Sequence, residues 1–282
     1  MTLMPDTVEL HAPGMSVLLD LANGGRAVSW MIDGLEILGT KSSDPVEYGM
    51  YPMAPWAGRV RDNALMFAGV QYPLRPSHGE WALHGTVLGS RARLTNCESS
   101  DEGASATIVT DLGPEWPWTG LLTCRWEVRA DCVTTTLTLE ADTEAFPGVL
   151  GWHPWFRRSL GVGQPARWDL PDPLLAERED GFRLTGALVA VDLASRAFDD
   201  TFLVESRSAS IEWPEHLRID VTSSHPWFVV FDELADFICI EPQSGPPNGI
   251  NDSLVAPATI VDDEQPLTLT NDWRIRRGRP AE

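Results

Sequence analysis

The chain has 282 residues, a hydrophobic fraction of 43% and a formal net charge of −20. This hydrophobic content is typical of a globular protein and excludes a disordered chain. The negative charge argues against nucleic acid and anionic membranes as partners, because both require basic patches. No apolar run approaches the roughly 18 residues of a membrane span, and Met1–Val17 lacks the basic and apolar segments of a signal peptide.

Several cofactor and metal classes are excluded by missing motifs. None of the four cysteines forms a C-x-x-C pair, and the six histidines show no metal-binding spacing. Glycine-rich phosphate loops and the G-x-S-x-G nucleophile elbow are also missing. We therefore expect a cytoplasmic protein with reduced thiols and with neither a metal nor a cofactor.

The chain is dominated by short segments in which apolar and polar residues alternate, as in half-buried strands. Thr123–Ala130 and Val133–Ala141 alternate on either side of a turn and predict a β-hairpin, and Asp33-Gly34 is a second hairpin turn. Only Leu174–Asp180, after two prolines, suggests one or two helical turns. In chain order, further strands are expected at Ser16–Leu21, Ala27–Ile32, Thr107–Thr110, Thr201–Val204, Arg218–Thr222, Phe228–Phe231, Phe237–Ile240 and Leu267–Thr270.

Many short strands separated by turn residues are typical of a sandwich or barrel. The 23 glycines and 22 prolines are spread between the strands rather than gathered in a linker. We therefore expect an all-β fold, a large antiparallel β-sandwich, with residues 1–282 in a single domain.

Glu241 is the carboxylate with the most informative position. It follows the apolar strand Phe237–Ile240 and precedes Pro242, which we expect to end the strand. A carboxylate at the mouth of a buried strand is partly desolvated, which raises its pKa toward the range of a general base. The alternative is a solvated glutamate that only marks the strand end.

Other polar residues in apolar or turn-rich segments are further candidates. His153 lies in G-W-H-P-W-F, where aromatic neighbours would tune its pKa, although it could equally be a core histidine. His84 precedes Gly85, which allows close backbone approach to a ligand. Arg59 and Arg61 would share a face on a strand, so that one could anchor a ligand oxygen and the other could pair with an acid. The acidic pair Asp199-Asp200 is most simply a solvated turn.

Taken together, these segments resemble the aldose 1-epimerase (galactose mutarotase) family. The resemblance rests on the ordered set P-W-A-G-R-V-R-D, L-H-G, W-H-P-W-F, F-D-D-T-F-L and I-E-P-Q-S-G-P-P-N. It implies a β-supersandwich with a sugar in a cleft on one face. It also implies that a monomer or homodimer interconverts the α and β anomers of a hexose in carbohydrate metabolism.

The family pattern assigns a role to individual residues of this chain. The general base falls on Glu241 and the general acid on His153. Substrate-binding residues fall on His84, Arg59 and Asp199. Among the 12 tryptophans, Trp155 and Trp56 are the first candidates to stack on a sugar, ahead of Trp81 and Trp152, although each of the four could be a core residue.

The chain departs from the family pattern around the sugar, with Gly58, Asn63-Ala64, Thr86 and Trp152 at positions where other residues are common. Two alternatives therefore remain beside the hexose epimerase. One is a hexose-6-phosphate 1-epimerase, and the other is a catalytically inactive sugar-binding module of the same fold. A glycosidase is disfavoured, because its two acidic groups are normally both carboxylates. A phosphate subsite would draw on Arg75, Arg91, Arg93, Arg157 and Arg158.

Overall fold

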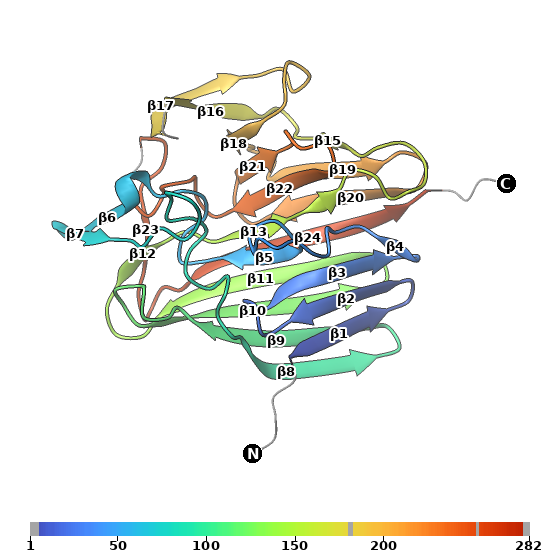
Figure 1. Ribbon diagram of the computed structural model, residues 1–282, viewed down its shortest axis with the longest axis horizontal. Helices are drawn as coiled ribbons and strands as arrows, with labels where there is room; N and C mark the ends of the chain where they lie inside the picture. The colour runs from blue at the N-terminus through green and yellow to red at the C-terminus, as the bar shows by residue number, and fades with distance from the viewer. Residues whose placement is uncertain (1–5, 180–182, 252–253, 279–282) are drawn as a thin grey trace.

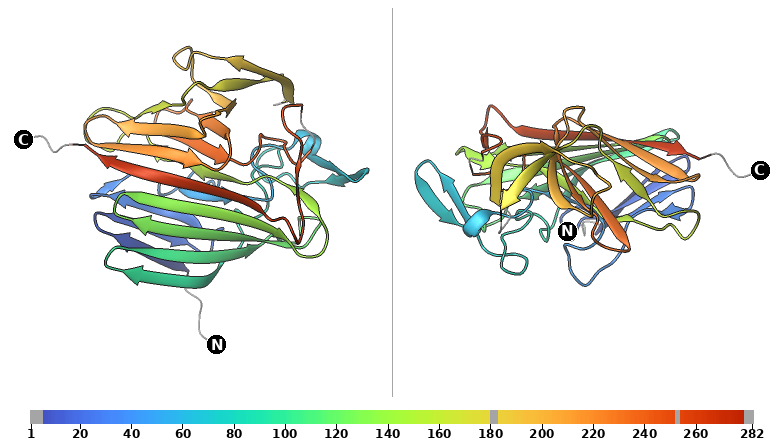
Figure 2. Two further views of the ribbon diagram at one scale, coloured as in Figure 1. Left: turned by 180° about the vertical axis from the view of Figure 1, so that it is seen from behind. Right: turned by 90° about the horizontal axis from the view of Figure 1, so that it is seen from above.

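The protein is built almost entirely of antiparallel strands, which form two large stacked sheets (Figures 1 and 2). The computed structural model describes residues 6–179, 183–251 and 254–278. The expected all-β sandwich is confirmed. Within those ranges the helical element is a single 3₁₀ turn, η1 (Arg61–Asn63), and no helix there has the length and apolar character needed to cross a membrane.

The first sheet has 12 strands and carries the candidate residues His153, Asp199 and Glu241. Its spatial order is β1 (Thr7–Ala12), β2 (Met15–Asp20), β3 (Arg26–Ile32), β5 (Met50–Met53), β13 (Gly151–Pro154), β22 (Phe237–Gln243), β21 (Trp227–Phe231), β18 (Asp199–Leu203), β16 (Leu174–Glu179) and β17 (Arg183–Ala190). Two short strands attach to it, β4 (Leu35–Glu36) beside β3 and β14 (Phe156–Arg157) beside β22.

The second sheet has eight strands and faces the viewer in the left panel of Figure 2. Its order is β15 (Arg167–Asp169), β19 (Ser208–Trp213), β20 (Leu217–Ser223), β24 (Leu267–Arg277), β11 (Cys132–Ala141), β10 (Gly120–Arg129), β9 (Gly103–Asp111) and β8 (Arg93–Ser100). Two small two-stranded antiparallel sheets complete the fold, β12 (Phe146–Gly148) with β23 (Thr259–Val261) and β6 (Ala64–Phe67) with β7 (Val70–Pro73).

Alternation along the strands decides which side chains enter the core. The predicted hairpin is confirmed as β10 and β11, which pair from Gly120↔Ala141 to Val128↔Val133. On β10, Trp126 is fully buried, whereas its neighbour Arg125 is exposed. The other predicted strands are also confirmed, as parts of β2, β3, β9, β18, β20, β21, β22 and β24. The Asp33-Gly34 turn joins β3 to β4.

Large aromatic side chains hold the two sheets together. Trp126 of β10 packs edge-to-face on Trp152 of β13, with ring centroids 5.0 Å apart. Trp30 of β3 makes a similar contact with Trp273 of β24 at 6.2 Å. All four side chains are fully buried. Much of the tryptophan excess therefore serves the core, and Trp152 is a core residue rather than a sugar-stacking one.

The same alternation sends the next residues to the opposite face of the first sheet. Because Trp152 points into the core, His153 points away from it, into a cavity on the other face. On β22, Ile240 lies in the apolar core, and its neighbour Glu241 lines that cavity. The two central strands therefore contribute both to the core and to the candidate site.

Two local predictions are wrong. We expected Pro242 to end the strand, but β22 continues to Gln243 and Pro242 pairs with Phe228. Proline removes one backbone donor, yet its fixed φ is compatible with extended structure. We also expected helical turns at 174–180, of which Asp180 lies outside the described residues. Leu174–Glu179 is instead strand β16, because pairing with β17 and β18 overrides local preference.

Gly85 allows two loops to approach the site closely. Its φ is +80°, and a Cβ at this position would lie 1.8 Å from the carbonyl oxygen of Ala54. The Thr86 N–H donates to that same oxygen at 2.8 Å. His84, which also has a positive φ of 59°, is held directly beside this contact.

We predict that Gly85→Ala destabilises the fold. The left-handed φ costs roughly 1–3 kcal/mol for alanine, and the backbone clash adds roughly 1–3 kcal/mol. Gly34→Ala is the matched control, because Gly34 has a φ of +82° but a Cβ added to it would meet no atom within 4 Å. In urea titrations the free energy of unfolding should fall further for Gly85→Ala than for Gly34→Ala. Equal losses would contradict the close approach.

Candidate active site

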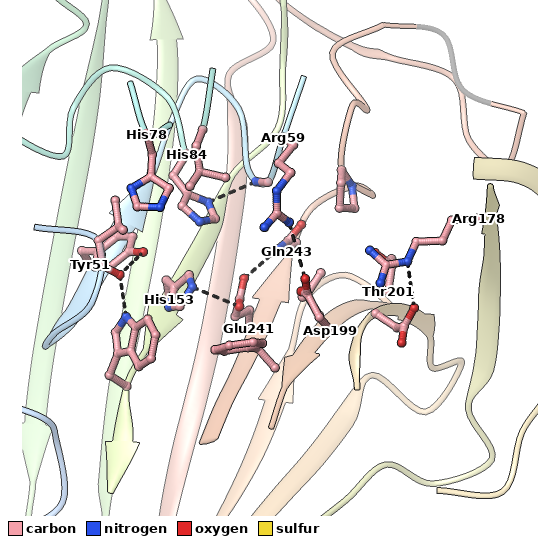
Figure 3. A pocket seen from close by; sticks show the side chains of 18 of the residues that line it. Tyr51, Arg59, His78, His84, His153, Arg178, Asp199, Thr201, Glu241 and Gln243 are labelled. Atoms are coloured by element: carbon pink, nitrogen blue, oxygen red, sulfur yellow. Dashed lines mark hydrogen bonds and ion pairs between the residues drawn. The ribbon is translucent and has the colours of Figure 1, made fainter. Parts of the chain in front are cut away.

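A buried histidine and a buried glutamate contact one another in the centre of the first sheet. His153 on β13 and Glu241 on β22 place Nε2 and Oε1 3.2 Å apart, and their side chains are 7% and 3% exposed. Both line a cavity of about 250 Å³. Figure 3 shows the two side chains directed toward each other at the floor of this cavity. We call them the His153–Glu241 pair.

Burial shifts the pKa of each member of the pair away from its ordinary value. It lowers the pKa of His153 to about 3. Burial raises the pKa of Glu241 well above that of an ordinary carboxyl group, and the nearby Asp199 carboxylate raises it further. The pair therefore holds one exchangeable proton over a wide pH range. This proton can lie on the carboxyl group or on the imidazole, so the pair can both accept and donate a proton.

Two aromatic rings fix the orientation of His153. Tyr51, its cross-strand neighbour on β5, stacks on it with ring centroids 4.8 Å apart, and Trp155 stacks on it at 5.3 Å. The Tyr51 hydroxyl and the Trp155 Nε1–H both donate to the carbonyl oxygen of Val46, at 2.9 and 2.8 Å. The histidine ring therefore packs on two rings that are themselves anchored.

His84 is placed as a neutral hydrogen-bond donor. The Gly58 N–H donates to His84 Nδ1 at 3.2 Å, so the ring proton lies on Nε2. Burial lowers the pKa of His84 well below its ordinary value, and the neighbouring His153 lowers it further. The His84 and His153 rings meet edge-to-face at 5.0 Å. His84 enters from the loop opposite the sheet (Figure 3).

The other end of the cavity is lined by paired charges. Arg59 lies 3.7 Å from Asp199. Asp200, only 4% exposed, contacts Arg178 at 3.1 Å and Arg196 at 2.7 Å. This end therefore presents both cationic donors and anionic acceptors, a combination suited to the hydroxyl groups of a neutral ligand.

Most of the predicted site residues come together here. His153, Glu241, His84, Arg59, Asp199 and Trp155 all line the cavity. Arg61, in contrast, belongs to η1 and pairs with the adjacent Asp62 at 3.5 Å.

Trp56 lies elsewhere. It is 3% exposed, packs on Trp116 with ring centroids 5.7 Å apart, and does not line the cavity. The prediction that Trp56 stacks on a ligand is therefore wrong, because its ring is used to pack the loops onto the core.

Sequence reasoning missed several cavity residues, among them Gln243, Tyr51 and Arg178. Gln243 donates from Nε2 to Glu241 Oε2 at 3.2 Å, and its place two residues after Glu241 on one strand was a usable signal once the strand was known to continue. Tyr51 lies in a short apolar run that reads only as core. Arg178 lies in the segment for which helical turns were expected, so its approach to the cavity had no sequence signal.

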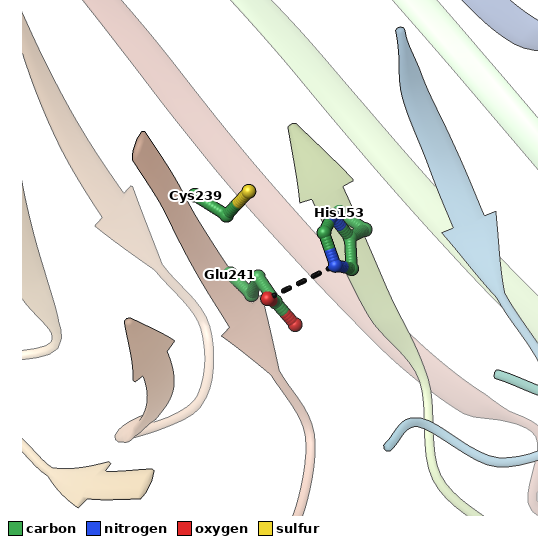
Figure 4. A group of neighbouring side chains, drawn as sticks. All are labelled: His153, Cys239 and Glu241. Carbon is green, nitrogen blue, oxygen red and sulfur yellow. Dashed lines mark ion pairs between the residues drawn. The ribbon is translucent and has the colours of Figure 1, made fainter. Parts of the chain in front are cut away.

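Cys239 lies next to the His153–Glu241 pair (Figure 4). Potential ligand atoms of Cys239, His153 and Glu241 all lie within 4.8 Å of one another. Burial raises the pKa of the Cys239 thiol well above its ordinary value, and metal ions bind the thiolate rather than the thiol. The thiol is therefore a neutral neighbour of the His153–Glu241 pair.

The fold and the cavity define a β-sandwich protein with a buried acid–base pair. A family model described as aldose 1-epimerase matches residues 6–262. The chain belongs to the aldose 1-epimerase family.

Individual proteins are similar to this chain in part of the sequence or in fold. YphB of Escherichia coli K12, an uncharacterized protein, is 26% identical over 145 residues, which is 50% of this chain and 49% of YphB. The match thus spans about half the length of that relative. A galactose mutarotase-like protein of Clostridium acetobutylicum has the same fold, with a TM-score of 0.84, 17% identity and coverage of 96% and 95% of the two chains. An Escherichia coli K12 protein provisionally assigned as an aldose 1-epimerase gives a TM-score of 0.80 at 20% identity, with 96% and 99% covered.

We predict that Glu241→Gln stabilises the protein at neutral and alkaline pH. Above the ordinary carboxyl pKa of 4.5 the unfolded state ionises Glu241 freely, whereas burial raises the pKa of this carboxyl group in the folded state and disfavours its ionisation. Wild-type stability is therefore lost as pH rises above this value, and the amide removes the loss. At pH 8 the Tm of the variant should exceed that of wild type by roughly 2–4 °C, about 1 kcal/mol, and the gain should vanish near pH 4.

Glu205→Gln, at an exposed turn position, is the control, and its Tm should equal that of wild type at every pH. A Glu241→Gln variant that is less stable than wild type at pH 8 would show that the carboxylate is not disfavoured by its surroundings.

Proposed function

We propose that this protein is an aldose 1-epimerase that interconverts the α and β anomers of a neutral hexose. The observation that carries the proposal is the contact of His153 Nε2 with Glu241 Oε1 at 3.2 Å, buried at the floor of a cavity. Membership of the aldose 1-epimerase family over residues 6–262 supports the reaction class. The side chains that line the cavity support a neutral hexose as the substrate.

The reaction requires one base and one acid that act on neighbouring oxygens. A cyclic aldose carries a hydroxyl oxygen and the ring oxygen on the same carbon, C1. Glu241 removes the proton of the C1 hydroxyl while His153 donates a proton to the ring oxygen, O5. The C1–O5 bond breaks, and C1 becomes an aldehyde. Rotation about C1–C2 and closure with the two roles reversed give the other anomer.

The geometry of the pair fits these two oxygens. The ring oxygen and the C1 hydroxyl oxygen are bonded to the same carbon and therefore lie close together. One can contact His153 Nε2 while the other contacts Glu241 Oε1. Because the pair already holds one exchangeable proton, the reaction neither adds nor removes a proton overall. Low solvent exposure strengthens both hydrogen bonds to the reacting oxygens.

The surrounding residues hold the ring. His84, as a neutral donor, and Arg59 would bind ring or hydroxyl oxygens, and Asp199 would accept from hydroxyls distant from C1. Trp155 presents an apolar ring to the cavity beside His153. The presence of the His153–Glu241 pair also argues against a catalytically inactive sugar-binding module, because binding alone does not require an acid and a base in contact.

Phosphorylated hexoses are a poorer fit to this cavity. None of the five arginines considered for a phosphate subsite lines it. Arg75 pairs with Glu115, Arg91 pairs with Asp6, and Arg157 and Arg158 donate to backbone carbonyls. Arg93 lies on β8 of the second sheet. The arginines that do line the cavity, Arg59 and Arg178, each face an aspartate.

We predict that Glu241→Gln and His153→Gln each lower kcat for mutarotation by about 10²–10⁴-fold, the range for loss of a general base or acid. Freshly dissolved α-D-glucose or α-D-galactose in weak, phosphate-free buffer is followed by polarimetry. Glu205→Gln serves as the unchanged control. Near-normal turnover by Glu241→Gln would remove the proposed base.

We further predict that kcat/KM for glucose exceeds that for glucose 6-phosphate by at least about tenfold. Arg59 and Arg178, which line the cavity, each face a carboxylate that neutralises their charge. A phosphate dianion would therefore find no net positive charge to bind. The two sugars are compared by anomer-specific NMR exchange. A preference for the phosphate would reverse the substrate assignment while leaving the pair in its role.

A further inference from the structure

Gln243 is buried in the cavity, and its amide oxygen has no hydrogen-bond partner among the described residues. The residue is 1% exposed and lines the cavity. Its Nε2 donates to Glu241 Oε2 at 3.2 Å, whereas its Oε1 is a buried oxygen without a hydrogen-bond partner among the described residues. A buried amide oxygen of this kind favours a ligand that brings a donor to it.

The position of Gln243 is fixed by the centre of the sheet. Its backbone pairs with Gly151 of β13 on one side and with Trp227 of β21 on the other. A Cβ on residue 151 would lie 3.1 Å from the Gln243 Cγ, so the glycine leaves room for this side chain. The sheet and the neighbouring glycine therefore direct the Gln243 side chain along the cavity floor beside Glu241.

The orientation of the Gln243 amide follows from the ionised state of Glu241, in which Glu241 can accept a proton from the substrate. In that state Glu241 is a carboxylate, which can only accept hydrogen bonds. Gln243 must then offer its Nε2–H to Oε2 and direct Oε1 elsewhere. The contact also holds the carboxylate, leaving Oε1 of Glu241 for His153 and the substrate.

The two carboxylate oxygens of Glu241 define an order across the cavity floor. Oε1 faces His153, and Oε2 faces Gln243, so Glu241 lies between them in Figure 3. A hemiacetal sugar has the same order: O5 on one side of C1, the C1 hydroxyl in the middle and C2 on the other side. With His153 at O5 and Glu241 at the C1 hydroxyl, Gln243 is adjacent to C2.

We propose that Gln243 both positions Glu241 and accepts a hydrogen bond from the sugar's C2 hydroxyl. This inference rests on the proposed epimerase function and deepens it, because it makes the substrate class aldoses with a free C2 hydroxyl. A sugar that lacks this hydroxyl leaves Gln243 Oε1 buried and unpaired in the complex, which costs binding and turnover.

The test compares D-glucose with 2-deoxy-D-glucose in wild type and in Gln243→Met, a side chain of similar length without hydrogen-bonding groups. For wild type, kcat/KM should be about tenfold or more higher for glucose, since a site built for a hydroxyl rejects the analogue that lacks it. For Gln243→Met this ratio should fall to near one, while kcat falls for both sugars because Glu241 is less well held. Gln71→Met, at an exposed position on β7, is the control and should keep the wild-type ratio.

The ratio within one variant is insensitive to a general loss of active protein, and thermal melting checks that Gln243→Met folds. A wild-type ratio near one, or an unchanged ratio in Gln243→Met, would overturn the role of Gln243. Binding of the two sugars, measured by saturation-transfer NMR, separates this failure from that of the proposed function. Absent turnover, with wild-type binding that prefers glucose and Gln243→Met binding that does not, would retain the hydroxyl contact and reject the epimerase. Absent turnover without that binding difference would reject both.

Discussion

The burial of a carboxyl group and an imidazole in direct contact is the constraint on which the rest of the site depends. In water near neutrality the carboxyl group would be fully ionised and the imidazole partly protonated. In the sheet interior, burial raises the pKa of Glu241 and lowers that of His153 to about 3, so one proton is held between them. A pair of this kind can give and take a proton in one cycle, which is what opening and closing a sugar ring requires.

The sandwich creates this constraint through the two-residue period of its strands. Trp152 enters the core against Trp126 of the opposite sheet, and this contact fixes the strand that turns His153 to the other face. Loops then cover that face: Gly85 permits the close approach that brings His84 over the pair. The apolar core and the polar cavity are thus opposite faces of the same central strands, so a change in core packing would be transmitted directly to the pair.

The sequence predicted the parts of this arrangement that depend on local pattern. Alternation in 123–141 predicted the hairpin, and the ordered motifs brought Glu241, His153 and His84 into one candidate site. The missed features depend on distant pairing. Strand β16 forms because β17 and β18 lie beside it, and Pro242 stays in its strand because Phe228 is in register with it. The burial of Trp56 against Trp116 likewise follows from how two loops meet, which no local pattern encodes.

The pH dependence of kcat/KM for mutarotation, corrected for the uncatalysed rate, tests the shared proton most directly. Because the imidazole of His153 has its pKa lowered to about 3 and the carboxyl of Glu241 has its pKa raised, the pair keeps one proton across neutral pH. The account predicts a flat profile between about pH 5 and 7, with no break at the ordinary histidine pKa of about 6.5. A tenfold change per pH unit on one side of that value would contradict it, because it would show that His153 titrates as an independent, solvated histidine.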